Sequence, residues 1–218
     1  MKDQDRMNDL ALIRGLMERS TRFLSLSGLS GVIAGTLALG GALLAQRYMH
    51  ERSLREGYPL EDGARAGTDG YLDHVLFLGG VALAVLVLSL ASAAYFTWRR
   101  GRRIGQGFWD PAAERLLINL LIPLAAGGIF CIALLYYGIP GLVPSATLIF
   151  YGLALVNASR YTLDEIRWLG LSELVLGLLS AFWVGAGLMF WALGFGVLHI
   201  FYGGMMYLRH ERCTTENR

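Results

Sequence analysis

Two ionisable residues stand inside otherwise apolar stretches of this 218-residue chain, and they are its best candidates for chemistry. Glu173 is the only acidic residue well inside an apolar run, and His199 is the only histidine inside one. A charge in the middle of a membrane helix costs about 2.5–3.5 kcal/mol on insertion scales, so such a residue usually faces the protein interior with a partner or a proton. The two residues therefore mark a candidate site.

Four classes of role can be considered for a glutamate beside a histidine in membrane helices. In proton-coupled transport the buried carboxyl group is neutral and releases its proton as access alternates between the two sides. Haem binding needs a second membrane histidine at that depth, and catalysis needs a nucleophile or a pattern such as HExxH or GxSxG, none of which the sequence contains. A structural link between helices needs nothing further. We expect no catalytic residue, metal or cofactor, and we keep transport, small-ligand binding and a structural link as alternatives.

Further polar residues fall in the cytoplasmic half of the predicted membrane segments. With Glu173 and His199 they outline a small ligand- or proton-binding pocket open toward the cytoplasm; they are Ser27, Ser30, Asn119, Asn157 and Tyr202. Pro123 lacks the N–H that would bond the carbonyl of Asn119, so this oxygen is open to a side chain or water. Alternatively, each polar side chain bonds only to backbone or to one neighbouring helix, as Ser and Asn often do in membranes.

The elements that position these residues are predicted to be six membrane-spanning helices. Hydrophobic residues make up 55% of the chain and charged residues only 17%, against about 25% charged in soluble domains. Several apolar runs approach the ~20 residues that a helix needs to cross a bilayer core, and they lack the alternation of β-barrel strands. The predicted fold is an all-α polytopic bundle with spans near residues 23–46, 75–98, 116–137, 144–157, 163–182 and 185–208.

The basic residues predict that both termini lie in the cytoplasm. With the N-terminus inside, 15 of the 19 Lys and Arg residues fall on the inner side, where basic residues near helix ends are retained. The predicted organisation is an amphipathic segment at 1–22, a transmembrane domain at 23–208 and a cytoplasmic tail at 209–218. Residues 47–73 are predicted to form a solvated outside loop. The first apolar run lacks a cleavage site, so we expect no signal peptide.

Two segments at the predicted membrane surface are candidate lipid contacts. Apolar side chains recur every three or four residues within 1–22, which predicts an amphipathic helix on the inner leaflet. A cytoplasmic extension of the first span and a partner-binding helix are the alternatives. A second segment carries an arginine cluster suited to anionic lipid headgroups, formed by Arg99, Arg100, Arg102 and Arg103. The net charge is only +2, and the basic residues are spread over the predicted membrane edges, which argues against nucleic-acid binding.

Helix register predicts that Glu173 and His199 share one depth. Thr162-Leu-Asp-Glu165 is typical of a capping box, and a helix beginning there places Glu173 about 16 Å from the cytoplasmic side. Counting back from Arg209 places His199 about 15 Å from the same side. A short turn near 184–187 makes the two spans antiparallel neighbours. We therefore predict a hydrogen bond between Glu173 and His199.

Small residues predict where the helices approach closely. Gly177 follows Glu173 by four residues, and Gly196 and Gly203 flank His199, which places both polar groups on predicted packing faces. In the first span Gly31 and Gly35 form a GxxxG pattern. That pattern suits packing within the bundle or between two copies in a homo-oligomer.

The last two spans resemble a known group of proteins. The stretch Tyr161-Thr-Leu-Asp-Glu-Ile-Arg-Trp-Leu-Gly-Leu-Ser-Glu173 and the later Phe195-Gly-Val-Leu-His199 resemble a family of small uncharacterised bacterial six-helix membrane proteins. The last hairpin is also similar to the HdeD-like acid-resistance membrane proteins, whose repeats are Gly-rich hairpins. Neither resemblance supplies an activity.

The expectation from sequence is a multi-pass protein of the bacterial inner (plasma) membrane. It binds or transports a small solute or a proton through a pocket around Glu173 and His199. The alternative is a non-transporting scaffold, sensor or regulatory partner. Two inverted halves are not evident, and a conductive pore needs more polar residues along its wall, so binding is favoured over a fast channel.

Overall fold

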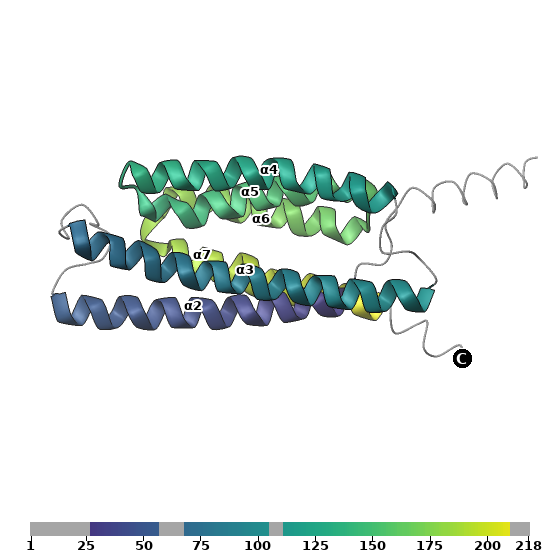
Figure 1. Cartoon of the computed structure of the whole chain (residues 1–218), viewed down its shortest axis with the longest axis horizontal. Helices are drawn as coiled ribbons and strands as arrows, with labels where there is room; N and C mark the ends of the chain where they lie inside the picture. Colours follow the sequence, from purple (N-terminus) through teal and green to yellow (C-terminus); the bar gives the residue numbers. More distant parts are fainter. Residues whose placement is uncertain (1–26, 57–67, 105–110, 210–218) are drawn as a thin grey trace, which may run out of the picture.

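The computed structural model describes residues 27–56, 68–104 and 111–209, and it is all-helical in these residues (Figure 1). The predicted all-α fold is confirmed. The predicted amphipathic segment at 1–22 and residues 210–218 of the tail lie outside the described residues. The principal helices are α2 (Gly28–Glu56), α3 (Thr68–Ile104), α4 (Pro111–Tyr136), α5 (Val143–Ala158), α6 (Asp164–Phe182), α7 (Gly187–Trp191) and α8 (His199–Tyr207).

The last helical segment is continuous but irregular. Helix α7 runs into a π-helical stretch, η4 (Ala192–Leu198), which runs directly into α8. A π-helix shifts hydrogen bonding from residue i+4 to i+5, and such insertions often occur at functional sites. The shift changes which side chains face each neighbour after residue 192.

In the part of the chain that the structure describes, five helical segments are long and apolar enough to cross a membrane, so the chain is a multi-pass membrane protein by the length and composition of its helices. They are Gly28–Leu54, Gly70–Arg102, Pro111–Tyr136, Pro140–Tyr161 and Val184–Tyr207. The predicted fifth span corresponds to α6, which has 19 residues and includes four ionisable side chains: Asp164, Glu165, Arg167 and Glu173. Helix α6 is not among these five segments.

The prediction of a solvated loop at 47–73 is wrong for both of its ends. Helix α2 continues to Glu56 and α3 begins at Thr68, because residues 47–56 contain no Gly or Pro that would break a helix. Arg52 of α2 donates hydrogen bonds to Tyr48 Oη at 2.8 Å and to the carbonyl of Gly70 at 3.3 Å. A hydrogen bond therefore links α2 to α3 in the region that was predicted to be a loop.

The helices form two groups with the last segment between them (Figure 1). Helix α2 packs against α3 and α8, whereas α5 packs against α4 and α6. The segment α7–η4–α8 contacts α2 on one side and α5 and α6 on the other. One end of the bundle, here the arginine end, carries Arg99, Arg160 and Arg209, and the opposite end, here the Gly138 end, carries the turn after α4.

The turn at the Gly138 end depends on glycine. The N–H of Ile139 donates to the carbonyl of Leu134 and the N–H of Gly138 to that of Leu135, which is the hydrogen-bond pattern of a Schellman motif. Gly138 has a φ of +70°, a conformation that other residues adopt only at a steric cost. This turn directs α5 back along α4.

Glycines also set two close helix crossings. At Gly152 of α5, a β-carbon would lie 2.7 Å from the carbonyl oxygen of Gly170 of α6. At Gly35 of α2, a β-carbon would lie 2.6 Å from the carbonyl oxygen of Gly196. The GxxxG pattern of the first span is thus used within the bundle, against the last helical segment.

Candidate functional site

Glu173 lies at the midpoint of α6, nine residues after Asp164 and nine before Phe182. Its side chain is fully buried, with 0% of the residue exposed. Helix α6 begins at Asp164, two residues after the predicted cap Thr162. Glu173 is therefore about 14 Å along the axis from either end of the helix, close to the distance of about 16 Å predicted from a start at Thr162.

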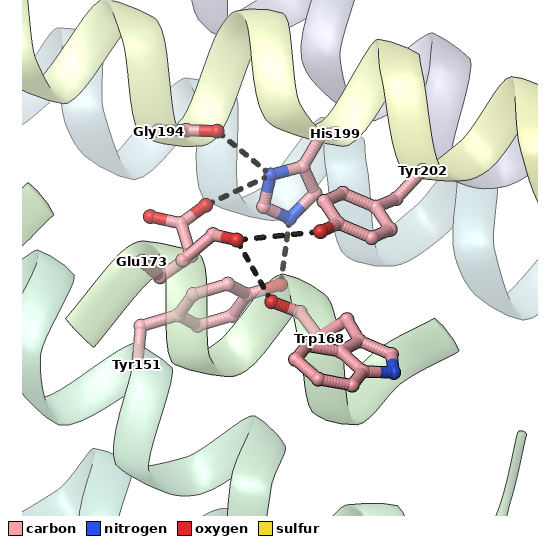
Figure 2. A network of polar contacts seen from close by, with 7 residues as sticks. Tyr151, Trp168, Glu173, Gly194, His199 and Tyr202 are labelled. Carbon is pink, nitrogen blue, oxygen red and sulfur yellow. Dashed lines mark hydrogen bonds and ion pairs between the residues drawn. The ribbon is translucent and has the colours of Figure 1, made fainter. Parts of the chain in front are cut away.

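His199 is the first residue of α8 and directly follows the π-helical stretch. Its Nδ1 lies 3.3 Å from Glu173 Oε1 and 3.2 Å from the carbonyl oxygen of Gly194, five residues earlier. Its Nε2 lies 2.8 Å from Tyr151 Oη of α5. Figure 2 shows the imidazole between the carboxyl group and the phenol, so three helical segments meet at one ring.

The two side chains lie close together as predicted, but the predicted hydrogen bond between Glu173 and His199 is wrong, because Nδ1 bonds the carbonyl of Gly194 instead. Neither oxygen of Glu173 has a hydrogen-bond partner among the described residues, although Nδ1 is within ion-pair distance. Leaving a buried polar group without a hydrogen bond costs about 1–3 kcal/mol, and a charged group costs more. The carboxyl group is thus buried at a cost to stability.

The carboxyl group is also tightly enclosed. A β-carbon on Gly194 would lie 2.5 Å from Glu173 Oε2 and would overlap Leu148 Cδ2. Leu148 of α5 is itself 0% exposed. The ring of Phe195 stacks on the His199 ring at a centroid distance of 5.9 Å. Apolar groups therefore fill the space around the two polar side chains.

The contacts of His199 determine where its proton lies in the neutral ring. A backbone carbonyl only accepts hydrogen bonds, so Nδ1 beside Gly194 carries the hydrogen. Nε2 then accepts from the hydroxyl group of Tyr151. A tyrosine hydroxyl can rotate and accept instead, so the same contact persists when Nε2 gains a proton.

Tyr151 is the part of the site that the sequence did not reveal. A single tyrosine in an apolar helix carries no signal of its own, and its role depends on α5 packing beside the last helical segment, which the sequence does not state.

The predicted packing faces also need correction. Gly196 and Gly203 pack against α2, and Gly177 packs against Leu148 and Ile149 of α5; the glycine that meets Glu173 is Gly194.

The other predicted pocket residues form separate contacts. Ser172 Oγ lies 3.3 Å from Tyr202 Oη and donates to the carbonyl of Trp168 at 2.9 Å (Figure 2). This contact lies one turn nearer the arginine end than His199. Ser30 of α2 donates to the carbonyl of Ser27, the residue before that helix, at 2.6 Å. A single pocket that unites these residues with Glu173 stays a prediction.

The carbonyl oxygen of Asn119, which the sequence predicts to be open to a side chain or water, accepts a hydrogen bond from a side chain. Asn157 Nδ2 of α5 donates to the carbonyl oxygen of Asn119 at 2.9 Å, the oxygen that Pro123 leaves without its helical donor. A weaker contact of 3.2 Å joins Asn157 Nδ2 to Asn119 Oδ1. This pair links α4 to α5.

The arginine cluster lies on helix rather than on the predicted loop, because α3 continues to Ile104. Arg102 lies over the ring of Trp98 at 4.4 Å from its centroid, and Arg99 is exposed. Arg100 is half-buried, and the side chain of Arg103 lies outside the described residues. Nearby, Arg209 Nη1 lies 3.4 Å from Glu165 Oε1 and joins the end of the last segment to the start of α6.

Comparison of the chain with protein-family models, with curated proteins and with solved structures gives no match. Within the described ranges, no three His, Cys, Asp or Glu side chains are grouped to hold a metal ion.

Proposed function

We propose that this membrane protein binds a proton at Glu173 and His199 and moves it across the membrane. The observation that carries the proposal is a fully buried carboxyl group at mid-helix, without a hydrogen-bond partner among the described residues, at 3.3 Å from an imidazole nitrogen. Ionisable residues inside membrane segments usually mark proton or substrate pathways. The other classes of role that the sequence left open lack such support.

A proton suits the site better than a small solute because it needs no volume. The space beside Glu173 Oε2 is closed by the backbone of Gly194 and by Leu148. A solute would need these groups to move, whereas a proton needs only a basic atom. This argument narrows the sequence-based expectation of a small solute or a proton to the proton.

The geometry supports two states of the pair. In one, a Glu173 carboxylate faces an imidazolium ring at ion-pair distance, and Nε2–H donates to Tyr151 Oη. In the other, the hydrogen of Nδ1 has passed to Glu173 Oε1, which leaves a neutral acid beside a neutral ring that keeps its hydrogen on Nε2. One proton moves between Nδ1 and Oε1, so charge is conserved. Transfer within the pair therefore needs only that the hydroxyl hydrogen of Tyr151 points away from Nε2 and that Nδ1 turns from the Gly194 carbonyl toward Oε1.

The test is proton flux into liposomes that contain the purified full chain, driven by a potassium diffusion potential and read with an internal pH dye. Glu173→Gln keeps the side-chain shape and removes the titratable proton, so we expect flux to fall to the level of protein-free liposomes. Glu114→Gln, at an exposed position of α4, is the matched control and should conduct as the wild type does. Wild-type flux that Glu173→Gln leaves unchanged would overturn the proposal.

The distribution of charge also supports a location and an orientation of the protein in the membrane. The described arginines of the α3 end, with Arg160 and Arg209, suit the cytoplasmic face and an anionic leaflet. This supports a bacterial inner-membrane protein with both termini inside. If no variant alters flux because the wild type conducts nothing, the scaffold or sensor alternative replaces transport.

A further inference from the structure

We infer that Leu148 is an apolar gate between the Glu173–His199 site and a second polar station formed by Ser145 and Ser180, so that the described state is closed toward the Gly138 end. The inference rests on the proposed function, since it concerns the route by which a proton reaches Glu173. It assigns roles to three residues that lie outside the predicted pocket.

The second station is a buried pair of hydroxyl groups. Ser145 Oγ of α5 donates to Ser180 Oγ of α6 at 2.9 Å, and the two residues are only 2% and 0% exposed. A serine hydroxyl can accept one hydrogen bond and donate another, which lets it relay a proton. Ser180 lies seven residues beyond Glu173 on α6, or about 10 Å nearer the Gly138 end.

Leu148 fills the gap between the two polar groups. It lies midway between Ser145 and Tyr151 on α5, at three residues from each. Its Cβ would lie 2.9 Å from a β-carbon on Gly177, which stands between Glu173 and Ser180 on α6. Its Cδ2 occupies the space that a β-carbon on Gly194 would take. Two glycines on two helices thus form a notch that one leucine fills.

The residues beside Glu173 toward the arginine end are polar, unlike the leucine toward the Gly138 end. There the site is followed by the contact between Ser172 and Tyr202, and both residues are partly exposed. One side of Glu173 therefore continues directly to hydroxyl groups, whereas the other side meets a fully buried leucine. Apolar constrictions exclude water and so interrupt proton transfer.

The test compares Leu148→Ser with Leu155→Ser in the same liposome flux assay. Both leucines are buried on α5, but Leu155 does not lie between the two polar stations. Burial of the Leu148 side chain favours the closed state over the open state by a factor of about 10 to 100. We therefore expect Leu148→Ser to raise flux by that factor and Leu155→Ser to leave flux unchanged. Leu148→Ala is the milder variant if the serine variant does not fold.

Two double variants complete the experiment. Leu148→Ser with Glu173→Gln should return flux to background, and Leu148→Ser with Ser180→Ala should lose most of the gain. A gain that survives both would overturn the gate, because the leak would then bypass the two stations. No gain in Leu148→Ser and Leu148→Ala, while Glu173→Gln still blocks wild-type flux, would refute the gate alone and keep the proton site. Failure of Glu173→Gln to alter flux would refute the proposed function instead.

Discussion

Residue 194, which faces the carboxyl group of Glu173 from η4, is a glycine and has no side chain. That absence lets the backbone of η4 approach the carboxyl group and presents the Gly194 carbonyl to His199 Nδ1 at 3.2 Å. At the scale of single residues, the site therefore depends on one missing methyl group as much as on its ionisable groups.

Gly194→Ala tests this dependence. The added β-carbon would lie 2.5 Å from Glu173 Oε2, so we expect a loss of about 1–3 kcal/mol of stability from overpacking and a loss of proton flux. Thermal unfolding of the detergent-solubilised protein measures the first effect. Gly128→Ala on α4, where a β-carbon would meet nothing within 4 Å, should instead gain up to about 1 kcal/mol from helix propensity. Equal stability of the two variants would contradict the tight fit.

At the scale of elements, helix α4 is linked to α5 through a hydrogen bond to a carbonyl oxygen that a proline leaves without its helical donor. Pro123 lacks the N–H that would bond Asn119 O, and Asn157 Nδ2 supplies a donor at 2.9 Å. The predicted opening at this carbonyl thus becomes a link between two helices. Its strength should depend on the proline.

A double-mutant cycle measures that dependence. Asn157→Ala should cost about 0.6–1.7 kcal/mol of stability in the wild type, the range of hydrogen bonds between membrane helices. In a Pro123→Ala background the restored N–H bonds Asn119 O, so the same substitution should cost less. Thermal unfolding of the four proteins gives the coupling energy. A coupling of zero would show that Asn157 does not compensate for the proline.

Register and connection length explain how much of the candidate site could be predicted from sequence. Glu173 and His199 were placed at one depth because rise per residue and a short turn are enough to fix depth in antiparallel helices. The faces could not be predicted as well, because the π-helical stretch before His199 alters the phase of every later residue. Tyr151 and Leu148 were missed because their roles require knowing that α5 lies beside η4.

The same reasoning applies to the helix ends. Composition predicted six apolar segments, and the structure shows them as six helical rods in the described residues. The predicted loop at 47–73 is too long because the polar residues of 47–56 continue the helix α2. Polarity ends the membrane-embedded part of a helix, but only Gly, Pro or a competing cap ends the helix itself.

At the scale of the whole molecule, the last helical segment joins the α2–α3 pair to the α4–α5–α6 group (Figure 1). Its α2-facing side carries glycines, and its opposite side carries His199. The contact between the first and last helices therefore holds the imidazole in place against α6. Loss of that contact should impair the site from a distance.

Gly203→Ala tests this arrangement with a control at the adjacent residue. A β-carbon at Gly203 would lie 2.8 Å from the carbonyl oxygen of Gly28 and 2.8 Å from the N of Val32, whereas one at Gly204 would meet nothing within 4 Å. We expect Gly203→Ala to lose about 1–3 kcal/mol of stability and part of its flux, while Gly204→Ala retains both. Light scattering on the same samples reports oligomeric state. Because Gly203 packs against α2 of the same chain, a change in oligomeric state with unaltered thermal stability would instead place this glycine at a contact between copies.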